Sequence, residues 1–131
     1  MANPAPIILF TYNRPWHTEQ TLSALKHNEL ADQSDLFIFC DGAKDNSDQE
    51  KIEKVHNLID STNGFKSVTV KKSQINKGLA NSIIDGVTEI VNKFGKVIVL
   101  EDDLVTSPYF LQFMNDGLNF YENEESVISI H

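Results

Sequence analysis

Five short apolar runs recur along the chain at fairly even intervals. Most of them are continuous rather than alternating, which is typical of strands that are buried on both faces of a parallel sheet. We therefore expect five β-strands. They are predicted at residues 7–10, 36–39, 68–70, 97–100 and 127–130.

Between these runs, apolar residues repeat with the period of an α-helix. The clearest pattern covers residues 79–94 and ends at Gly95, a residue type that commonly follows a last helical turn. A capping-box sequence at residues 47–50 predicts the start of another helix. A further helix is predicted from the Ser-Pro pair at 107–108, and a weaker one from Pro15, where threonines dilute the pattern.

The predicted elements alternate between strand and helix, which indicates an α/β fold with a mainly parallel sheet. Right-handed crossover connections would place helices on both faces of that sheet. No repeat or linker divides the chain, so residues 1–131 are expected to belong to a single domain. Because natural chains usually extend beyond their last core element, we expect that this one is cut off after its fifth strand. The alternative is a compact five-stranded domain that ends there.

The net charge of −8 argues against a nucleic-acid-binding protein, since a phosphate backbone requires a basic face. An acidic chain that binds a phosphorylated ligand needs a cation or well-aimed N–H groups to offset the repulsion. The single cysteine, Cys40, follows an apolar run and is expected to be a small buried hydrophobe. The first apolar run is too short for a signal peptide or a transmembrane helix. We therefore expect a cytoplasmic location, with peripheral membrane contact left open.

Conspicuous polar residues follow four of the predicted strands. Ligands of open α/β sheets bind at the carboxyl ends of the strands, where the strand order reverses. The residues are Thr11, Tyr12, Asn13 and Arg14 after the first strand, Asp41 after the second, Asn76, Lys77 and Gly78 shortly after the third, and Glu101, Asp102 and Asp103 after the fourth. Their coincidence at one sheet edge is a stronger indication of a ligand site than any single motif.

The acidic triplet, Glu101, Asp102 and Asp103, is the sharpest of these signals. Adjacent carboxylates at the end of a buried strand repel one another and resist desolvation. A divalent cation would offset that cost, and oxygen ligands suit Mg²⁺ or Mn²⁺. The alternative is a solvated acidic loop before a helix N-terminus. The metal hypothesis requires Asp103 to face the pocket formed by the loops after the first and fourth strands.

The other segments also have structural alternatives. Residues 11–14 could frame a base and a phosphate, or they could form a polar loop that caps the first helix. Asp41 could accept hydrogen bonds from a base or a ribose, although an Asp-Gly turn is the favoured interpretation of this pair alone. Lys77 and nearby N–H groups could reach a phosphate at a helix N-terminus, or Lys77 could be an ordinary residue at a helix start.

Together, these segments resemble the GT-A glycosyltransferases, in particular family 2 enzymes and N-acetylglucosaminyltransferase I-like enzymes. The matching segments occur in the family's order and spacing and cover nearly the whole chain. They are residues 7–15, 39–42, 76–80 and 97–103. The first and last are fairly specific, and the middle two are weak when taken alone.

The resemblance implies a Rossmann-like GT-A domain that transfers a hexosyl or N-acetylhexosaminyl group from a nucleotide-diphosphate sugar, most often a UDP-sugar. The acceptor would be a hydroxyl of a carbohydrate or glycolipid, and inversion is expected. Residues 11–14 and Asp41 would hold the base and ribose, and residues 76–78 would line the donor pocket. The triplet matches the DXD element. Its Asp103 would bind Mn²⁺ or Mg²⁺, while Glu101 and Asp102 would face ribose, sugar or metal-bound water.

The sequence offers no candidate for the catalytic base, which in this family usually lies beyond the fifth strand. Other nucleotide-binding classes fit less well, because no glycine-rich turn follows the first strand and no G-x-x-x-x-G-K-[ST] sequence is present. A response-regulator-like protein would carry its acidic pair after the first strand. The remaining alternative is a non-catalytic α/β module that binds a nucleotide or a protein. Its acidic residues would then be exposed surface residues without a role in metal binding.

Overall fold

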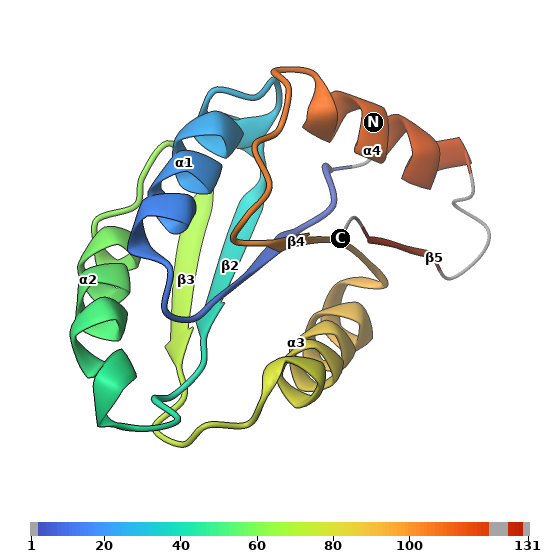
Figure 1. The fold of residues 1–131 in the computed structure, drawn as a ribbon. Helices are drawn as coiled ribbons and strands as arrows, with labels where there is room; N and C mark the ends of the chain where they lie inside the picture. Colours follow the sequence, from blue (N-terminus) through green and yellow to red (C-terminus); the bar gives the residue numbers. More distant parts are fainter. Residues whose placement is uncertain (1–2, 121–125, 130–131) are drawn as a thin grey trace.

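The computed structural model describes residues 3–120 and 126–129. Its five strands form one sheet in the order β3-β2-β1-β4-β5, and each neighbouring pair is parallel (Figure 1). The strands are β1 Ile7–Thr11, β2 Asp35–Cys40, β3 Ser67–Lys72, β4 Lys96–Glu101 and β5 Ser126–Ser129. The predicted α/β fold with a mainly parallel sheet is confirmed. Ile130, predicted at the end of the last strand, lies outside the described residues.

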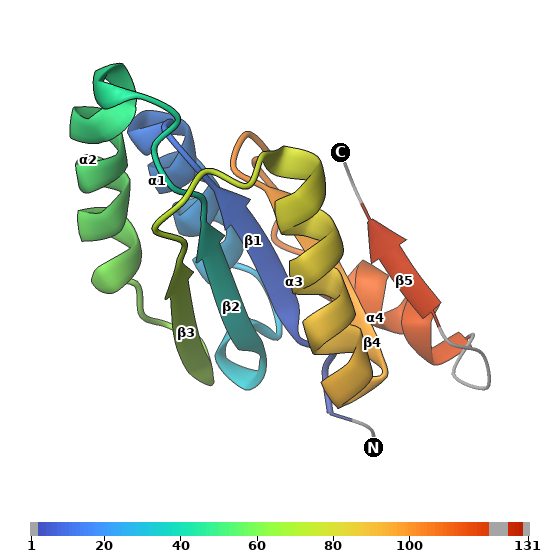
Figure 2. The same cartoon turned by 90° about the horizontal axis from the view of Figure 1, so that it is seen from below.

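Helices cover both faces of the sheet, as the sequence predicts. One face carries α1 (Pro15–Lys26), α2 (Gln49–Asp60) and α4 (Phe110–Phe120), and the other carries α3 (Leu79–Phe94) (Figure 2). Successive side chains of β1 enter opposite cores, because side chains alternate along a strand. This double burial explains why the central strands are continuously apolar.

The placement of α4 differs from the expectation of uniformly right-handed crossovers. It lies on the same face as α1, although β5 extends the sheet away from β2. The β4-α4-β5 and β1-α1-β2 connections therefore have opposite hands. The buried Asn28 joins α1 to this segment, because its Nδ2 donates to Thr106 Oγ1 at 2.9 Å and its Oδ1 accepts from Leu111 N at 2.9 Å. These bonds hold α4 on the face of α1 together with the packing of Leu111, Met114 and Leu118 in the shared core.

Two helix starts also differ from the sequence-based prediction. The expected capping box is not formed, because a 3₁₀ turn at Asn46–Asp48 precedes α2 and the Asp45 side chain accepts from Ser47 N at 2.9 Å. The last described helix begins at Phe110, since Phe110 N donates to Ser107 O at 3.1 Å in a turn that precedes the helix. In each case a neighbouring turn satisfies one backbone N–H group near the helix start, that of Ser47 or of Phe110.

Candidate functional site

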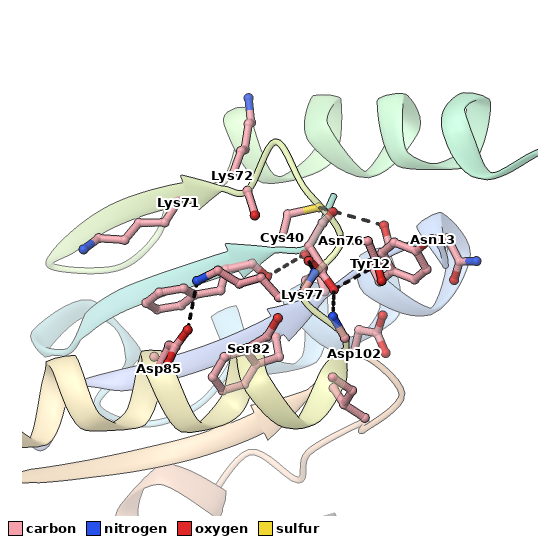
Figure 3. Close-up of a pocket in the computed structure, with 18 of the residues that line it drawn as sticks. Tyr12, Asn13, Cys40, Lys71, Lys72, Asn76, Lys77, Ser82, Asp85 and Asp102 are labelled. Atoms are coloured by element: carbon pink, nitrogen blue, oxygen red, sulfur yellow. Dashed lines mark hydrogen bonds and ion pairs between the residues drawn. The ribbon is translucent and has the colours of Figure 1, made fainter. Parts of the chain in front are cut away.

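A cavity of about 620 Å³ opens at the carboxyl ends of β1, β2 and β4 (Figure 3). It lies where the strand order reverses, which is the usual ligand site of an open α/β sheet. Its volume falls in the range of small-molecule pockets. Every residue predicted for nucleotide-sugar binding lines it. These are Thr11, Tyr12, Asn13, Arg14, Asp41, Asn76, Lys77, Gly78, Glu101 and Asp102.

The cavity also has a wall on α3 that the sequence reasoning missed. This wall consists of Ser82, Asp85, Gly86 and Glu89, and the rings of Phe10 and Phe39 lie near it. A Cβ atom built on Gly86 would be 2.9 Å from the Phe10 ring, so the α3 backbone packs directly on that ring. The other lining residues that were not predicted are Cys40, Lys44, Lys71, Lys72, Ser73 and Leu79. The helical spacing of the polar residues opposite the apolar face of α3 could have revealed this wall.

The cavity gathers basic residues in an otherwise acidic chain. Of the chain's eleven lysines and arginines, five line it, namely Arg14, Lys44, Lys71, Lys72 and Lys77. Lys71 pairs with Glu89, and Lys77 pairs with Asp85 at 3.1 Å, at solvent-exposed positions where such pairs are weak. Five carboxylates also line the cavity, namely Asp41, Asp85, Glu89, Glu101 and Asp102. The formal charge of the lining is therefore balanced, whereas the whole chain carries −8.

Arg14 connects the loop after β1 to the acidic triplet. Its Nη2 donates to Asp102 Oδ1, and its Nη1 lies 3.8 Å from Asp103 Oδ2. Burial raises the pKa of Asp102 above its ordinary value, although the Arg14 charge and hydrogen bond partly counter this. The Asp102 carbonyl also accepts from Thr21 Oγ1 at 2.8 Å. Part of the positive charge that the triplet was expected to require is thus supplied by an arginine.

Asp103 does not line the cavity, although the metal hypothesis requires it to face this pocket. Its side chain is 46% exposed and lies beside Arg14, which does line the cavity. Within residues 3–120 and 126–129, no three His, Cys, Asp or Glu side chains converge closely enough to form a metal site. A cation at Asp103 would therefore take most of its ligands from water and a bound phosphate, as Mg²⁺ commonly does.

Tyr12 and Asn13 are both held by Asp48, a residue predicted from the sequence only as part of a helix cap. The Tyr12 hydroxyl donates to Asp48 Oδ2 at 2.7 Å, and Asn13 Nδ2 donates to Asp48 Oδ1 at 2.8 Å. Lys44 N in turn donates to the Tyr12 hydroxyl oxygen at 2.8 Å. Burial, with the hydrogen bond to Asp48, raises the pKa of Tyr12, and the two donated bonds lower the pKa of Asp48. These contacts fix the Tyr12 ring at the cavity.

The Tyr12–Asp48 contact predicts a pH-dependent effect of the Tyr12→Phe substitution. The pKa of Asp48 in the folded state lies below its ordinary value of 3.8. Its contribution to stability is therefore complete above that pH and is lost as the pH falls through the folded-state pKa. We expect Tyr12→Phe to lower the free energy of unfolding at pH 6 and to lower it less at pH 3. Urea unfolding measures both values.

A suitable control for this substitution is Tyr109→Phe, because Tyr109 is 67% exposed. The control should leave the free energy of unfolding unchanged at both pH values. An equal loss for Tyr12→Phe at the two pH values would contradict a bond to an ionised Asp48.

Asp41 is fully engaged with backbone and amide groups. Its Oδ1 accepts from Gly42 N and Lys77 N, each at 2.9 Å. Its Oδ2 accepts from Gly78 N at 3.0 Å and from Asn76 Nδ2 at 3.2 Å. These bonds join the end of β2 to the beginning of α3. The Asp41 carboxylate, which was predicted to accept hydrogen bonds from a base or a ribose, is therefore already bound by other groups of the protein.

Thr11 and Cys40 line the cavity but are committed to the sheet. Both are buried, and Thr11 Oγ1 donates to Phe39 O at 3.0 Å. Burial raises the pKa of the Cys40 thiol, which stays protonated at neutral pH. The prediction that Cys40 is a small buried hydrophobe is confirmed.

No protein-family model matches this chain, and no curated protein matches its sequence. In the part of the chain that the structure describes, no helix is both long and apolar enough to cross a bilayer. The fold and the site define a Rossmann-like α/β domain with a ligand-sized cavity at the switch point of its sheet.

Proposed function

We propose that the chain is the nucleotide-sugar-binding part of a metal-dependent GT-A glycosyltransferase. The donor would be a nucleotide-diphosphate sugar, most often a UDP-sugar, and the acceptor a hydroxyl of a carbohydrate or glycolipid. One observation carries the proposal. Four segments that are far apart in the sequence, each predicted from the sequence to bind the ligand, line one cavity.

The lining chemistry supports a diphosphate near Arg14. The Arg14 side chain is 45% exposed, so it can donate to a phosphate oxygen while it still contacts Asp102. Asp102 is tied to Arg14 and Thr21, which fixes the direction in which the triplet leaves β4. These residues would bind and orient the donor without taking part in bond breaking.

The triplet has the donor atoms that Mg²⁺ or Mn²⁺ prefers, because all its side chains are carboxylates. Asp103 lies outside the cavity lining, so we propose that it would hold the ion beside Arg14, with Glu101 and Asp102 on the adjacent cavity wall. A bound ion would supply Lewis-acid stabilisation of the charge that develops on the leaving diphosphate. Because the protein offers few ligands on its own, metal binding should depend on the nucleotide.

Thermal unfolding tests this proposal. UDP with Mn²⁺ should raise the Tm by several degrees, as expected for a ligand well above its Kd, and UDP alone should not. Asp103→Ala should abolish the shift with little change in the ligand-free Tm, since Asp103 is half-exposed. The matched control is Asp32→Ala, an exposed carboxylate outside the cavity, which should keep the shift. If no nucleotide shifts the wild type, donor binding by this chain is excluded.

A second candidate is a non-catalytic module that binds a nucleotide or a protein. The Arg14 contacts with Asp102 and Asp103 favour it, because they offset the charge of the triplet without a metal. This candidate predicts a Tm shift of equal size with and without Mn²⁺.

A further inference from the structure

We infer that Asp41 is a positioning residue that fastens residues 76–78 and the beginning of α3 to the end of β2. In this role Asp41 shapes the cavity and does not contact the nucleotide. The identity of the ligand in this inference rests on the proposed function. The attachment of residues 76–78 to β2 rests only on the hydrogen bonds of Asp41.

The first support is the number of hydrogen bonds at the carboxylate. An ionised carboxyl group has about four acceptor positions. Asp41 receives four hydrogen bonds, three from backbone N–H groups and one from the Asn76 amide. No acceptor position remains for a ribose hydroxyl or a base N–H. Direct recognition would require at least one of these bonds to break.

The second support is the close packing around this attachment. A Cβ atom built on Gly42 would lie 2.6 Å from the carbonyl carbon and oxygen of Ile75, so the loop lies directly against the glycine. Asn76 Nδ2 donates to Gly42 O at 2.8 Å, and Ser73 N donates to Cys40 O at 2.9 Å. The Asp41 carboxylate is the charged group within this contact.

The third support is electrostatic. Gly78 is the N-cap residue of α3, and the N-terminus of a helix attracts negative charge. Asp41 already accepts from Lys77 N and Gly78 N there. A ligand phosphate at this end of the cavity would meet a fixed carboxylate. The N–H groups of Lys77 and Gly78 are therefore already bound by Asp41 and are not available to a ligand phosphate.

Hydrogen exchange and binding together test the inference. Asp41→Asn keeps the shape of the side chain but replaces one acceptor oxygen with an NH₂ group. The Lys77 and Gly78 amides should then exchange about tenfold faster or more, because they lose charge-assisted bonds. The affinity for UDP with Mn²⁺ should fall about tenfold, since the cavity wall is no longer fixed. The control is Asp85→Asn, which lines the same cavity but bonds only the Lys77 ammonium. It should leave the exchange of both amides unchanged.

Unchanged exchange in Asp41→Asn would overturn the inference. So would a loss of UDP affinity without faster exchange, because that result means direct contact with the nucleotide. If the wild type binds no UDP, the proposed function fails while the exchange rates still decide the role of Asp41. If Asp41→Asn does not fold, hydrogen exchange of the wild type tests the inference. Rapid exchange of its Lys77 and Gly78 amides would contradict the attachment.

Discussion

Replacing Gly42 with alanine is expected to lower the free energy of unfolding by about 3 kcal/mol, as for other overpacked buried positions. The new Cβ atom would lie 2.6 Å from two backbone atoms of Ile75. Backbone atoms cannot rotate away as the end of a long side chain can. The loop must therefore move as a whole, and the bonds from Asp41 to residues 76–78 must lengthen or break.

Urea unfolding measures this loss, and Gly95→Ala is its matched control. Gly95 ends α3 with a φ of 80°, as predicted from the sequence, and its Cβ atom would meet nothing within 4 Å. The control should lose only about 1 kcal/mol through backbone strain. Equal losses in the two variants would contradict the close approach of the loop to Gly42.

Replacing Arg14 with methionine is expected to lower the free energy of unfolding by about 2 kcal/mol at neutral pH. The substitution leaves the buried Asp102 carboxylate without its counter-charge. A fully buried pair would lose more, but the Arg14 side chain is 45% exposed and solvent screens it. The same substitution should weaken binding of UDP with Mn²⁺, because Arg14 is the cation proposed to hold the diphosphate.

The effect of Arg14→Met should depend on pH. Burial already raises the pKa of Asp102, and removal of Arg14 should raise it further. The folded state then prefers the protonated acid, so the destabilisation is greatest above the folded-state pKa and shrinks as the pH falls through it. Urea unfolding at pH 7 and pH 4 measures this.

The double variant Arg14→Met with Asp102→Asn is the control for that experiment. It should recover most of the lost stability at pH 7, since it contains no buried charge. A single variant as stable as the wild type at pH 7 would contradict the coupling of these two residues.

The central strands of the sheet could be predicted because they are buried on both faces. Such strands must be continuously apolar, so β1 and β4 were apparent from their uninterrupted apolar runs. The hand of the connection through α4 could not be predicted in this way. The contacts that hold α4 on its face include those of Asn28, whose partners Thr106 and Leu111 are about eighty residues away in the sequence.

The candidate site was predictable to the extent that topology determines it. Parallel strands bring their carboxyl ends to one edge, so polar residues after separate strands were expected to meet. The sequence did not specify their partners. Asp48 holds Tyr12, Asp41 holds a backbone loop, and Arg14 holds Asp102. Each pairing depends on distances between segments that are remote in sequence, and no local pattern encodes those distances.

The most direct test of the proposed function is the affinity for UDP, measured by calorimetric titration in Mn²⁺ and again in EDTA. We predict binding that is at least about tenfold tighter in Mn²⁺, a difference of roughly 1.4 kcal/mol. This difference should vanish in Asp103→Ala. Equal affinity of the wild type in Mn²⁺ and in EDTA would contradict a metal-dependent nucleotide-sugar site.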